Sequence, residues 1–160
     1  MAFEDLSLVL KWRNDVRTRS FMFNPNVIDY DTHRRWFVKN HKEPLRYLML
    51  VCSYEKPFGF VQFSADKDKN VWEWGFYIDP DCKRGCGSIM GRTALDYASR
   101  YLGIRQVQGR VLSNNPKSLS FHQKLGFTQD YILEAGHLSE NGPLDVHCLS
   151  IQLPHLLNTI

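Results

Sequence analysis

The chain has 160 residues, of which 43% are hydrophobic and 23% are charged, and its formal net charge is +3. This length fits one domain with a substantial buried core, and the composition excludes wholesale disorder and collagen-like repetition. The apolar runs are too short to span a bilayer, and no basic segment ahead of an apolar run marks a signal peptide. We therefore expect a single cytoplasmic domain over residues 1–160 that does not enter a membrane.

The charges are interspersed along the chain, and this pattern does not indicate nucleic-acid binding, which needs a concentrated basic stripe. Among the four cysteines, Cys82 and Cys86 lie close together, whereas Cys52 and Cys148 stand far from them and from each other. The close pair lacks a second pair of ligands nearby, so we expect no metal site. We interpret all four cysteines as reduced thiols.

Apolar residues recur at helical spacing near the N-terminus, and segments rich in β-branched and aromatic residues follow. The pattern predicts, in chain order, helices at Phe3–Arg13 and from Asp29 or Asp31 to Asn40, then strands at Arg46–Ser53, Phe58–Ser64 and Val71–Asp79. A polar run at Asp66–Asn70 is expected to form the hairpin loop between the last two of these strands.

After a loop at Pro80–Gly87, helices and strands alternate. The pattern predicts a helix at Ser88–Tyr101, a strand at Gln106–Leu112, a helix at Pro116–Leu125, and strands at Phe127–Glu134 and Val146–Leu153 with a loop at Gly136–Pro143 between them. A strand that leads through a helix to another strand forms a parallel crossover, whereas the earlier meander is antiparallel. The expected fold class is therefore α+β (mixed α/β), with a mostly antiparallel mixed sheet.

The segment Tyr77–Ser88 combines the end of a strand, a loop with Lys83, Arg84, Gly85 and Gly87, and the start of a helix. Helix N-termini expose unpaired amide N–H groups and a partial positive charge, and they bind phosphates. Glycines let the backbone approach an anion closely. The segment matches neither a Walker loop nor the complete Gly-x-Gly-x-x-Gly fingerprint, so an ordinary strand-to-helix connection stays an alternative.

The segment Asn114–Phe127 resembles the second motif of the GNAT-type N-acetyltransferases, which use acetyl-CoA. The matching residues are Asn115, Ser118, Lys124, Leu125, Gly126 and Phe127. The first motif of that family, Gln/Arg-x-x-Gly-x-Gly/Ala, falls on Cys82, Gly85 and Gly87, with Cys82 departing from it. The resemblance implies an acetyl-CoA-dependent enzyme with the GNAT fold, in which helices cover both faces of the sheet and one parallel strand pair splays apart.

The same resemblance implies which residues hold acetyl-CoA. The cofactor-binding positions are Phe76, Tyr77, Ile78, Lys83, Arg84, Gly85, Cys86, Gly87, Ser88, Asn115, Ser118 and Lys124.

Leu10–Asn14, Phe21–Met22, His33 and Trp36–Phe37 resemble the branch of the family that acetylates UDP-linked 4-amino sugars in pseudaminic acid biosynthesis, which serves to decorate flagellin. The resemblance implies direct transfer from acetyl-CoA to the primary amine of a nucleotide-linked amino sugar of the UDP-4-amino-4,6-dideoxy type. The partner would be this small molecule, and the protein would be a monomer or homodimer.

The substrate-binding residues implied by this branch are Trp12, Arg13, Asn14, His33 and Trp36. The two indoles offer flat apolar faces to a sugar or base, and Arg13, with Arg34 or Arg35, suits a diphosphate. Core packing stays the alternative for Trp12, and a solvated helix face stays the alternative for the arginines.

Acyl transfer to an amine needs a neutral amine and a proton for the leaving thiolate. His122 stands where the family has a tyrosine near the thioester, and a protonated histidine could supply that proton. Glu73 lies in an aromatic strand, and a carboxylate there is costly unless it faces a polar cleft, which predicts a base for the amine. A packed His122 and a salt-bridged or exposed Glu73 are the alternatives.

Two rival functions stay open. The same fold could acetylate a protein N-terminal amine, as ribosomal-protein acetyltransferases do, or another small amine. A non-catalytic acyl-CoA-binding module is the second rival, because Cys82 and His122 replace the usual residues. The run Trp12-Arg13-Asn14 favours the nucleotide sugar.

Overall fold

The computed structural model describes residues 1–65 and 71–154. The hairpin loop predicted at Asp66–Asn70 lies outside the described residues. The remaining predicted elements fall within them, and they are compared with the structure below.

The described strands form one six-stranded sheet in the order β1-β2-β3-β4-β6-β5. The strands are β1 (Arg46–Ser53), β2 (Lys56–Ala65), β3 (Val71–Ile78), β4 (Gln106–Leu112), β5 (Thr128–Ser139) and β6 (Gly142–Gln152). Every neighbouring pair is antiparallel except β3 and β4, which are parallel. The predicted α+β class with a mixed sheet is therefore confirmed.

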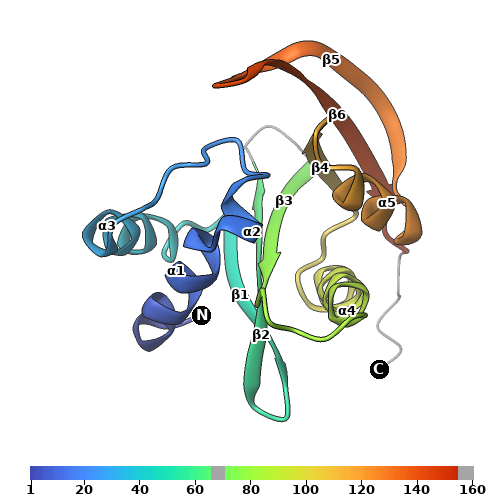
Figure 1. The fold of residues 1–160 in the computed structure, drawn as a ribbon. Coiled ribbons are helices and arrows are strands. Elements are labelled where there is room, and N and C mark those ends of the chain that lie inside the picture. The colour runs from blue at the N-terminus through green and yellow to red at the C-terminus, as the bar shows by residue number, and fades with distance from the viewer. Residues whose placement is uncertain (66–70, 155–160) are drawn as a thin grey trace.

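Helices cover both faces of this sheet (Figure 1). The helical elements are η1 (Phe3–Asp5), α1 (Leu6–Asn14), α2 (Val16–Arg19), α3 (Tyr30–Asn40), α4 (Cys86–Tyr101) and α5 (Pro116–Lys124). Helices α1, α2 and α3 lie on one side, and α4 and α5 lie on the other. None of the helices in the described ranges is both long and apolar enough to cross a membrane.

Alternation along the strands supplies a core to each face. On β2, Val61 and Phe63 point toward α4 and α5, whereas Phe60 packs with Val9 and Trp12 of α1. Strand β3 continues the alternation, because Trp72, Trp74, Phe76 and Ile78 join the first cluster and Tyr77 joins the second. A period of two on a sheet covered on both sides explains why nearly every residue of these strands is apolar.

Local capping explains where three helices begin. The Asp29 carboxylate accepts a hydrogen bond from the Thr32 amide at 2.8 Å, which identifies Asp29 as the cap of α3. The Asn115 side chain accepts from the Ser118 amide at 3.1 Å, and Pro116 occupies the first position of α5, as predicted. Helix α4 starts at Cys86, two residues earlier than predicted, after Gly85 with a positive φ of 100°.

The C-terminal hairpin differs from its prediction. The expected loop at Gly136–Pro143 is mostly strand, because β5 continues to Ser139 and β6 begins at Gly142. The ladder shifts register twice, between Gln129 and Tyr131 and between Leu133 and His137. Bulges of this kind absorb extra residues while pairing resumes beyond them, and such an interruption hides a long strand from a search for strict alternation.

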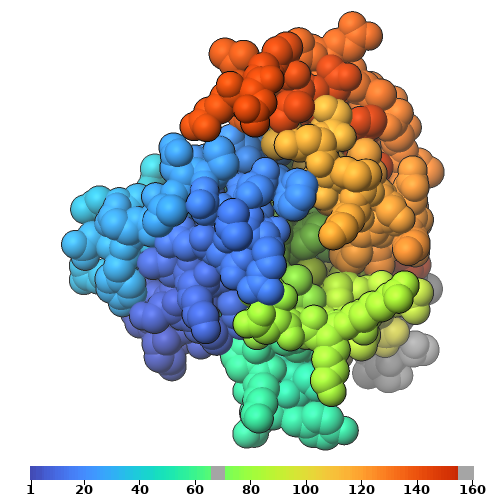
Figure 2. Space-filling view, in the orientation of Figure 1, coloured from blue at the N-terminus to red at the C-terminus, as the bar shows by residue number. Residues whose placement is uncertain are grey.

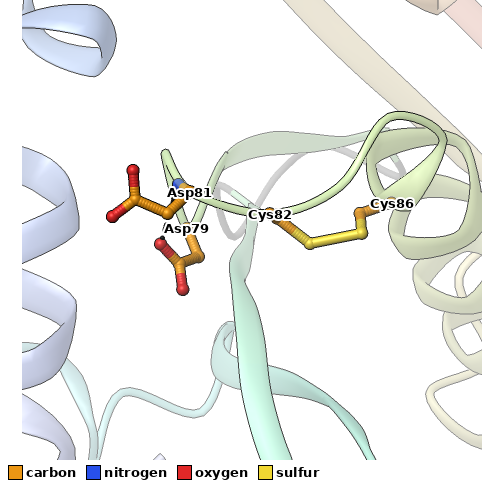
Figure 3. Close-up of a disulfide and its surroundings, with 4 residues drawn as sticks. All are labelled: Asp79, Asp81, Cys82 and Cys86. Carbon is orange, nitrogen blue, oxygen red and sulfur yellow. Dashed lines mark hydrogen bonds between the residues drawn. A yellow bond between two sulfur atoms is a disulfide. The ribbon is translucent and has the colours of Figure 1, made fainter.

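The cysteine prediction is wrong for two of the four residues. Cys82 and Cys86 form a disulfide across the loop between β3 and α4 (Figure 3), whereas Cys52 and Cys148 are free. The turn brings the two Cα atoms to 6.4 Å, within the range that a disulfide bridges. The absence of an export signal gave no information about this local geometry.

The packing predicts that replacing two different valines by alanine changes the free energy of unfolding by very different amounts. Val61 is fully buried under α4, whereas Val27 is 66% exposed. Val61→Ala removes two buried methyl groups and leaves a cavity, so we expect the free energy of unfolding to fall by about 2 kcal/mol. Val27→Ala should change it by less than about 0.5 kcal/mol. Urea denaturation of both variants measures the difference, and equal losses would contradict the core described here.

Candidate active site

An open cleft begins where the parallel pairing of β3 and β4 ends. The two strands pair only from Val71–Gln106 to Glu73–Gln108. Beyond this point lies a cleft of about 640 Å³, lined by residues of α1, α2, β2, β3, β4, α4, α5 and the loop after α2. Figure 2 shows the hollow between the blue N-terminal helices, the yellow-green start of α4 and the orange segment of α5. The C-terminal half of β3 borders the cleft. On the side of β4, among the described residues, its backbone N–H and C=O groups do not pair with a neighbouring strand.

The loop before α4 has the form of an anion site. Among the hydrogen bonds of the described residues, none is donated by the amides of Lys83, Arg84 or Gly85. Gly85 turns the chain with its positive φ, and the first amides of α4 follow directly. Lys83 and Arg84 are exposed beside them. Free amides, a helix N-terminus and two cations fit a phosphate or pyrophosphate group.

Glu73 and Arg110 form an ion pair across the cleft where β3 and β4 separate. The Arg110 Nε and Nη2 atoms both donate to Oε1 of Glu73, at 2.9 and 2.7 Å. Both side chains are 46% exposed, and both line the cleft. Within the described residues, Oε2 of Glu73 accepts no hydrogen bond. The carboxylate is therefore salt-bridged, as the alternative interpretation held, and the residue also lines the cleft.

His122 lies at the inner wall of the cleft, and both of its ring nitrogens have partners. Trp74 Nε1 donates to His122 Nε2 at 3.1 Å, and His122 Nδ1 lies 2.8 Å from the Ser118 carbonyl oxygen. An indole N–H can only donate, so Nε2 must accept and Nδ1 must bear the proton. Burial lowers the pKa of His122. These contacts describe a neutral imidazole, 2% exposed.

Gly109 of β4 makes this arrangement possible. A Cβ atom at this position would lie 2.6 Å from Nε2 of His122 and 3.0 Å from Nε1 of Trp74. No side chain can occupy that space while the two rings stay hydrogen-bonded. The strand backbone therefore approaches the histidine closely because residue 109 is a glycine.

A second, smaller cavity of about 300 Å³ adjoins the cleft. Residues that line both are Arg13, Met22, Gln62, Gly75, Phe76 and Tyr77. Its remaining wall includes Trp36 and His33, whose rings stack with centroids 5.2 Å apart. This cavity lies on the α1 and α3 side of the sheet, and we call it the Arg13 pocket.

Three polar side chains in the Arg13 pocket have buried atoms that lack a hydrogen-bond partner among the described residues. They are Nη1 of Arg13, Nε2 of His33 and Oε1 of Gln62. Arg13 donates through Nη2 to the Asn24 carbonyl oxygen at 2.5 Å, and no carboxylate among the described residues pairs with its charge. Burial lowers the pKa of Arg13, and it raises the pKa of the neighbouring Tyr77. Unpaired buried groups of this kind are rare unless a ligand completes them.

Two of the implied substrate residues do not reach this pocket. Trp12 is 2% exposed and packs in the core with Val9 and Phe60, so its indole face is not available to a substrate. The Asn14 side chain donates to and accepts from the backbone of Ile28, at 2.7 and 2.9 Å, which fixes the segment before α3. The structure therefore corrects Trp12 to the core-packing role of the alternative interpretation, whereas the substrate role of Asn14 stays a prediction. The helical spacing that suggested a binding face for Trp12 is equally the spacing of a core stripe.

The other predicted positions divide between the cavities and the surface. Arg13, His33 and Trp36 line the Arg13 pocket, and their role in substrate binding stays a prediction. The cofactor-binding positions that line the larger cleft are Phe76, Tyr77, Ile78, Gly87, Asn115 and Ser118. Outside both cavities lie Lys83, Arg84, Gly85, Cys86, Ser88 and Lys124, together with Arg34 and Arg35.

Sequence analysis did not assign a site role to many residues that line the cavities, among them Gln62, Trp74, Arg110 and Lys117. Gln62 is a polar side chain between the buried Val61 and Phe63 of β2, and this was a usable signal. Arg110 did not stand out in the same way, because Gln106 and Gln108 precede it in β4. The hydrogen bond from Trp74 to His122 joins residues 48 positions apart, so no local pattern could have indicated it.

A family model describing the acetyltransferase (GNAT) domain matches residues 1–128. The chain belongs to the GNAT acetyltransferase family. The enzymes of this family use acetyl-CoA. The predicted family, activity class and cofactor are therefore confirmed. Acetyltransferases named PseH from two strains of Campylobacter jejuni are 30% and 29% identical over 125 residues, or 78% of this chain and of each relative.

Solved structures have the same fold. Spermidine N-acetyltransferase from Vibrio cholerae, in complex with CoA and spermine, has a TM-score of 0.86 at 20% identity and covers 96% of this chain and 92% of its own. An N-acetyltransferase from Staphylococcus aureus Mu50 has a TM-score of 0.79 at 20% identity, covering 96% of both chains. At this identity the likeness concerns the GNAT fold and not the acceptor.

The buried histidines make stability depend on pH. The pKa of His122 and of His33 is lowered by burial, so below pH about 6.5 the unfolded chain takes up protons that the folded chain does not. The contribution of these two histidines to stability is therefore constant above this pH and falls as the pH drops below it. We expect the free energy of unfolding to decrease between pH 7.5 and 5.5, and His122→Gln, which can still accept from Trp74, to reduce that decrease. Urea denaturation at both pH values measures it, and an identical decrease in the variant would contradict a neutral His122.

Proposed function

We propose that the protein transfers the acetyl group of acetyl-CoA directly to the primary amine of a nucleotide-linked amino sugar, of the UDP-4-amino-4,6-dideoxy type. The observation that carries this proposal is the Arg13 pocket, with three unpartnered polar groups between aromatic walls. A guanidinium without a carboxylate partner suits an anionic group such as a diphosphate, and it can also donate to the carbonyl oxygens of a neutral base. The similarity to acetyltransferases named PseH supports an acetylation in a sugar pathway.

Charge argues against a polyamine acceptor. The solved relative from Vibrio cholerae binds spermine, which is a polycation. A polycation would meet Arg13 at the wall that both cavities share, and Arg19 adds a second positive charge that lowers the pKa of Arg13 further. Like charges in a partly buried site repel strongly. The pocket therefore favours an anionic acceptor over spermidine.

The larger cleft suits acetyl-CoA, which supplies an activated acetyl thioester when bound. The backbone amides of Lys83, Arg84 and Gly85, together with the first turn of α4, would hold its phosphates. The open edge of β3 at Phe76, Tyr77 and Ile78 offers backbone groups to the rest of the molecule. These three residues line the larger cleft, and Phe76 and Tyr77 also line the Arg13 pocket.

Glu73 is the proposed acceptor of the amine proton, directly or through a water. Its Oε1 is held by Arg110, and Oε2 is left for the cleft. Arg110 also packs against Phe23, with its guanidinium carbon 5.4 Å from the ring centroid. These contacts fix the carboxylate in place, and a fixed proton acceptor is the requirement of general base catalysis.

The acid role of His122 stays a prediction, and it has a cost. Protonating Nε2 would put two donors face to face and break the hydrogen bond from Trp74. The same protonation would charge a ring that is almost fully buried. The Ser118 hydroxyl, 3.4 Å from Nδ1, also lines the cleft, and solvent can supply a proton as well.

The acceptor assignment is tested by thiol release from acetyl-CoA with a UDP-4-amino-4,6-dideoxy sugar, spermidine and an N-terminal peptide as acceptors. We expect turnover with the sugar nucleotide above both others. Arg13→Gln should raise the KM for it roughly tenfold to hundredfold, because a charged hydrogen bond is lost, with little change in the KM for acetyl-CoA. Arg34→Gln, an exposed arginine of α3, is the matched control and should leave both constants unchanged.

Faster turnover of spermidine or peptide would overturn the acceptor, while leaving the acetyltransferase family intact. Binding of acetyl-CoA with no turnover of any amine would favour the non-catalytic module instead.

Replacing Glu73 tests the proposed base. Glu73→Gln keeps a carbonyl oxygen for Arg110 but removes the proton acceptor, so we expect kcat near pH 7 to fall roughly hundredfold. The loss should shrink at alkaline pH, where the amine is already neutral. Glu134→Gln, an exposed carboxylate on β5, should not change kcat. A pH-independent loss in Glu73→Gln would assign Glu73 to positioning Arg110 rather than to proton transfer.

A further inference from the structure

The disulfide between Cys82 and Cys86 encloses the amides of the proposed phosphate site. The bond closes a small ring over Lys83, Arg84 and Gly85, whose N–H groups are undonated among the hydrogen bonds of the described residues. Figure 3 shows the bridge at the turn between β3 and α4. The disulfide and the anion site therefore share the same stretch of backbone, so the state of the bond affects the shape of the site.

Both ends of the ring are built into the elements beside it. Cys86 is the first residue of α4, and its amide donates to the Lys83 carbonyl oxygen at 3.2 Å. Cys82 donates through its amide to the Asp79 carbonyl oxygen at 2.9 Å. On the outer side, Arg17 of α2 pairs with Asp81 at 3.0 Å. The disulfide adds a covalent cross-link, besides the peptide backbone, between the end of the turn and the helix.

The bridge is accessible to reagents in solution. Cys82 and Cys86 are partly exposed, and the three residues between them are exposed. A thiolate at Cys86 would lie at the N-terminus of α4 beside Lys83 and Arg84, and these positive groups favour it as a leaving group. Cys148, in contrast, is free but buried in β6.

We propose that Cys82 and Cys86 form a reversible thiol–disulfide modification site that sets the affinity for acetyl-CoA. This inference rests on the proposed assignment of the Lys83–Gly85 loop to the phosphates of the cofactor. The partner in the reaction is a dithiol reductant of the thioredoxin class, or a low-molecular-weight thiol in excess.

The exchange balances in two steps. A reductant thiolate attacks Cys82 Sγ, forms a mixed disulfide and releases the Cys86 thiolate, which takes a proton. The second thiol of the reductant then attacks the reductant sulfur of the mixed disulfide. This step releases Cys82 as a thiol and closes the disulfide of the reductant. Two electrons and two protons move from reductant to protein, and a disulfide oxidant reverses the sequence.

Reduction weakens cofactor binding through conformational entropy. With the bridge closed, the three amides are held in a short ring before the cofactor arrives. With the bridge open, binding must order Lys83, Arg84 and Gly85, and ordering backbone costs free energy. We expect the Kd for the coenzyme to rise about threefold to tenfold on reduction, a range typical of modest preorganisation effects. Turnover at saturating cofactor should change little, because the loop lies outside the cleft region of Glu73 and His122.

The test measures the Kd for desulfo-CoA, which has no thiol to exchange, by calorimetry on the full chain. The oxidised protein is compared with protein reduced by a phosphine and freed of it, and thiol counting verifies each state. The double variant Cys82→Ser/Cys86→Ser should bind as the reduced protein does and ignore the reductant. Cys52→Ser, which removes an exposed free cysteine, is the matched control and should keep the full response.

Three results overturn the inference. They are equal Kd values in the two redox states, a double variant that binds like the oxidised protein, and a Cys82–Cys86 pair that oxidants cannot close. Gly87→Glu separates these failures from failure of the loop assignment, because it places a carboxylate beside the amides. If Gly87→Glu loses desulfo-CoA binding while redox state has no effect, the phosphate site stands and the switch is rejected. If Gly87→Glu binds normally, the loop assignment itself is rejected.

Discussion

The separation of β3 from β4 is the constraint on which the rest of the site depends. Parallel pairing stops after Glu73 and Gln108, and beyond that point the backbone of β3 has an open edge. The Glu73–Arg110 ion pair lies at the divergence, and the His122–Trp74 pair fills the inner wall. A sheet with continuous pairing here would have no room for a substrate between its central strands.

The two cavities differ in which of their polar groups lack hydrogen-bond partners among the described residues. At the divergence of β3 and β4, the side chains of Glu73 and Arg110 and those of Trp74 and His122 are paired with each other, and the open groups belong to the backbone of β3 and of the loop before α4. In the Arg13 pocket, side chains supply the unpartnered atoms. A common GNAT cofactor suits a site made of backbone, because backbone geometry depends little on side-chain identity. An acceptor suits a site made of side chains, since substitutions there change specificity without altering the fold.

Much of this architecture could be predicted from the sequence. The alternation of β3, the proline at the start of α5 and the two GNAT motifs gave the fold, the family and the cofactor. The protonation states of buried side chains, and the contacts between distant elements that set them, could not be predicted. The neutral state of His122 depends on Trp74, a contact between distant elements, and the burial of Trp12 depends on Phe60. The bulges of β5 and the bridge between Cys82 and Cys86 depend on local backbone geometry that composition and spacing do not encode.

The central claim is that the diverging strands hold acetyl-CoA with its reacting end toward the Arg13 pocket. A crystal structure with desulfo-CoA and a UDP-amino sugar tests it most directly. The account predicts coenzyme phosphates on the amides of Lys83–Gly85, the pantetheine along Phe76–Ile78, and the acceptor phosphate or base within hydrogen-bonding distance of Arg13 Nη1 and His33 Nε2. A coenzyme bound away from the β3–β4 divergence, or an acceptor that leaves Arg13 and His33 without partners, would contradict it.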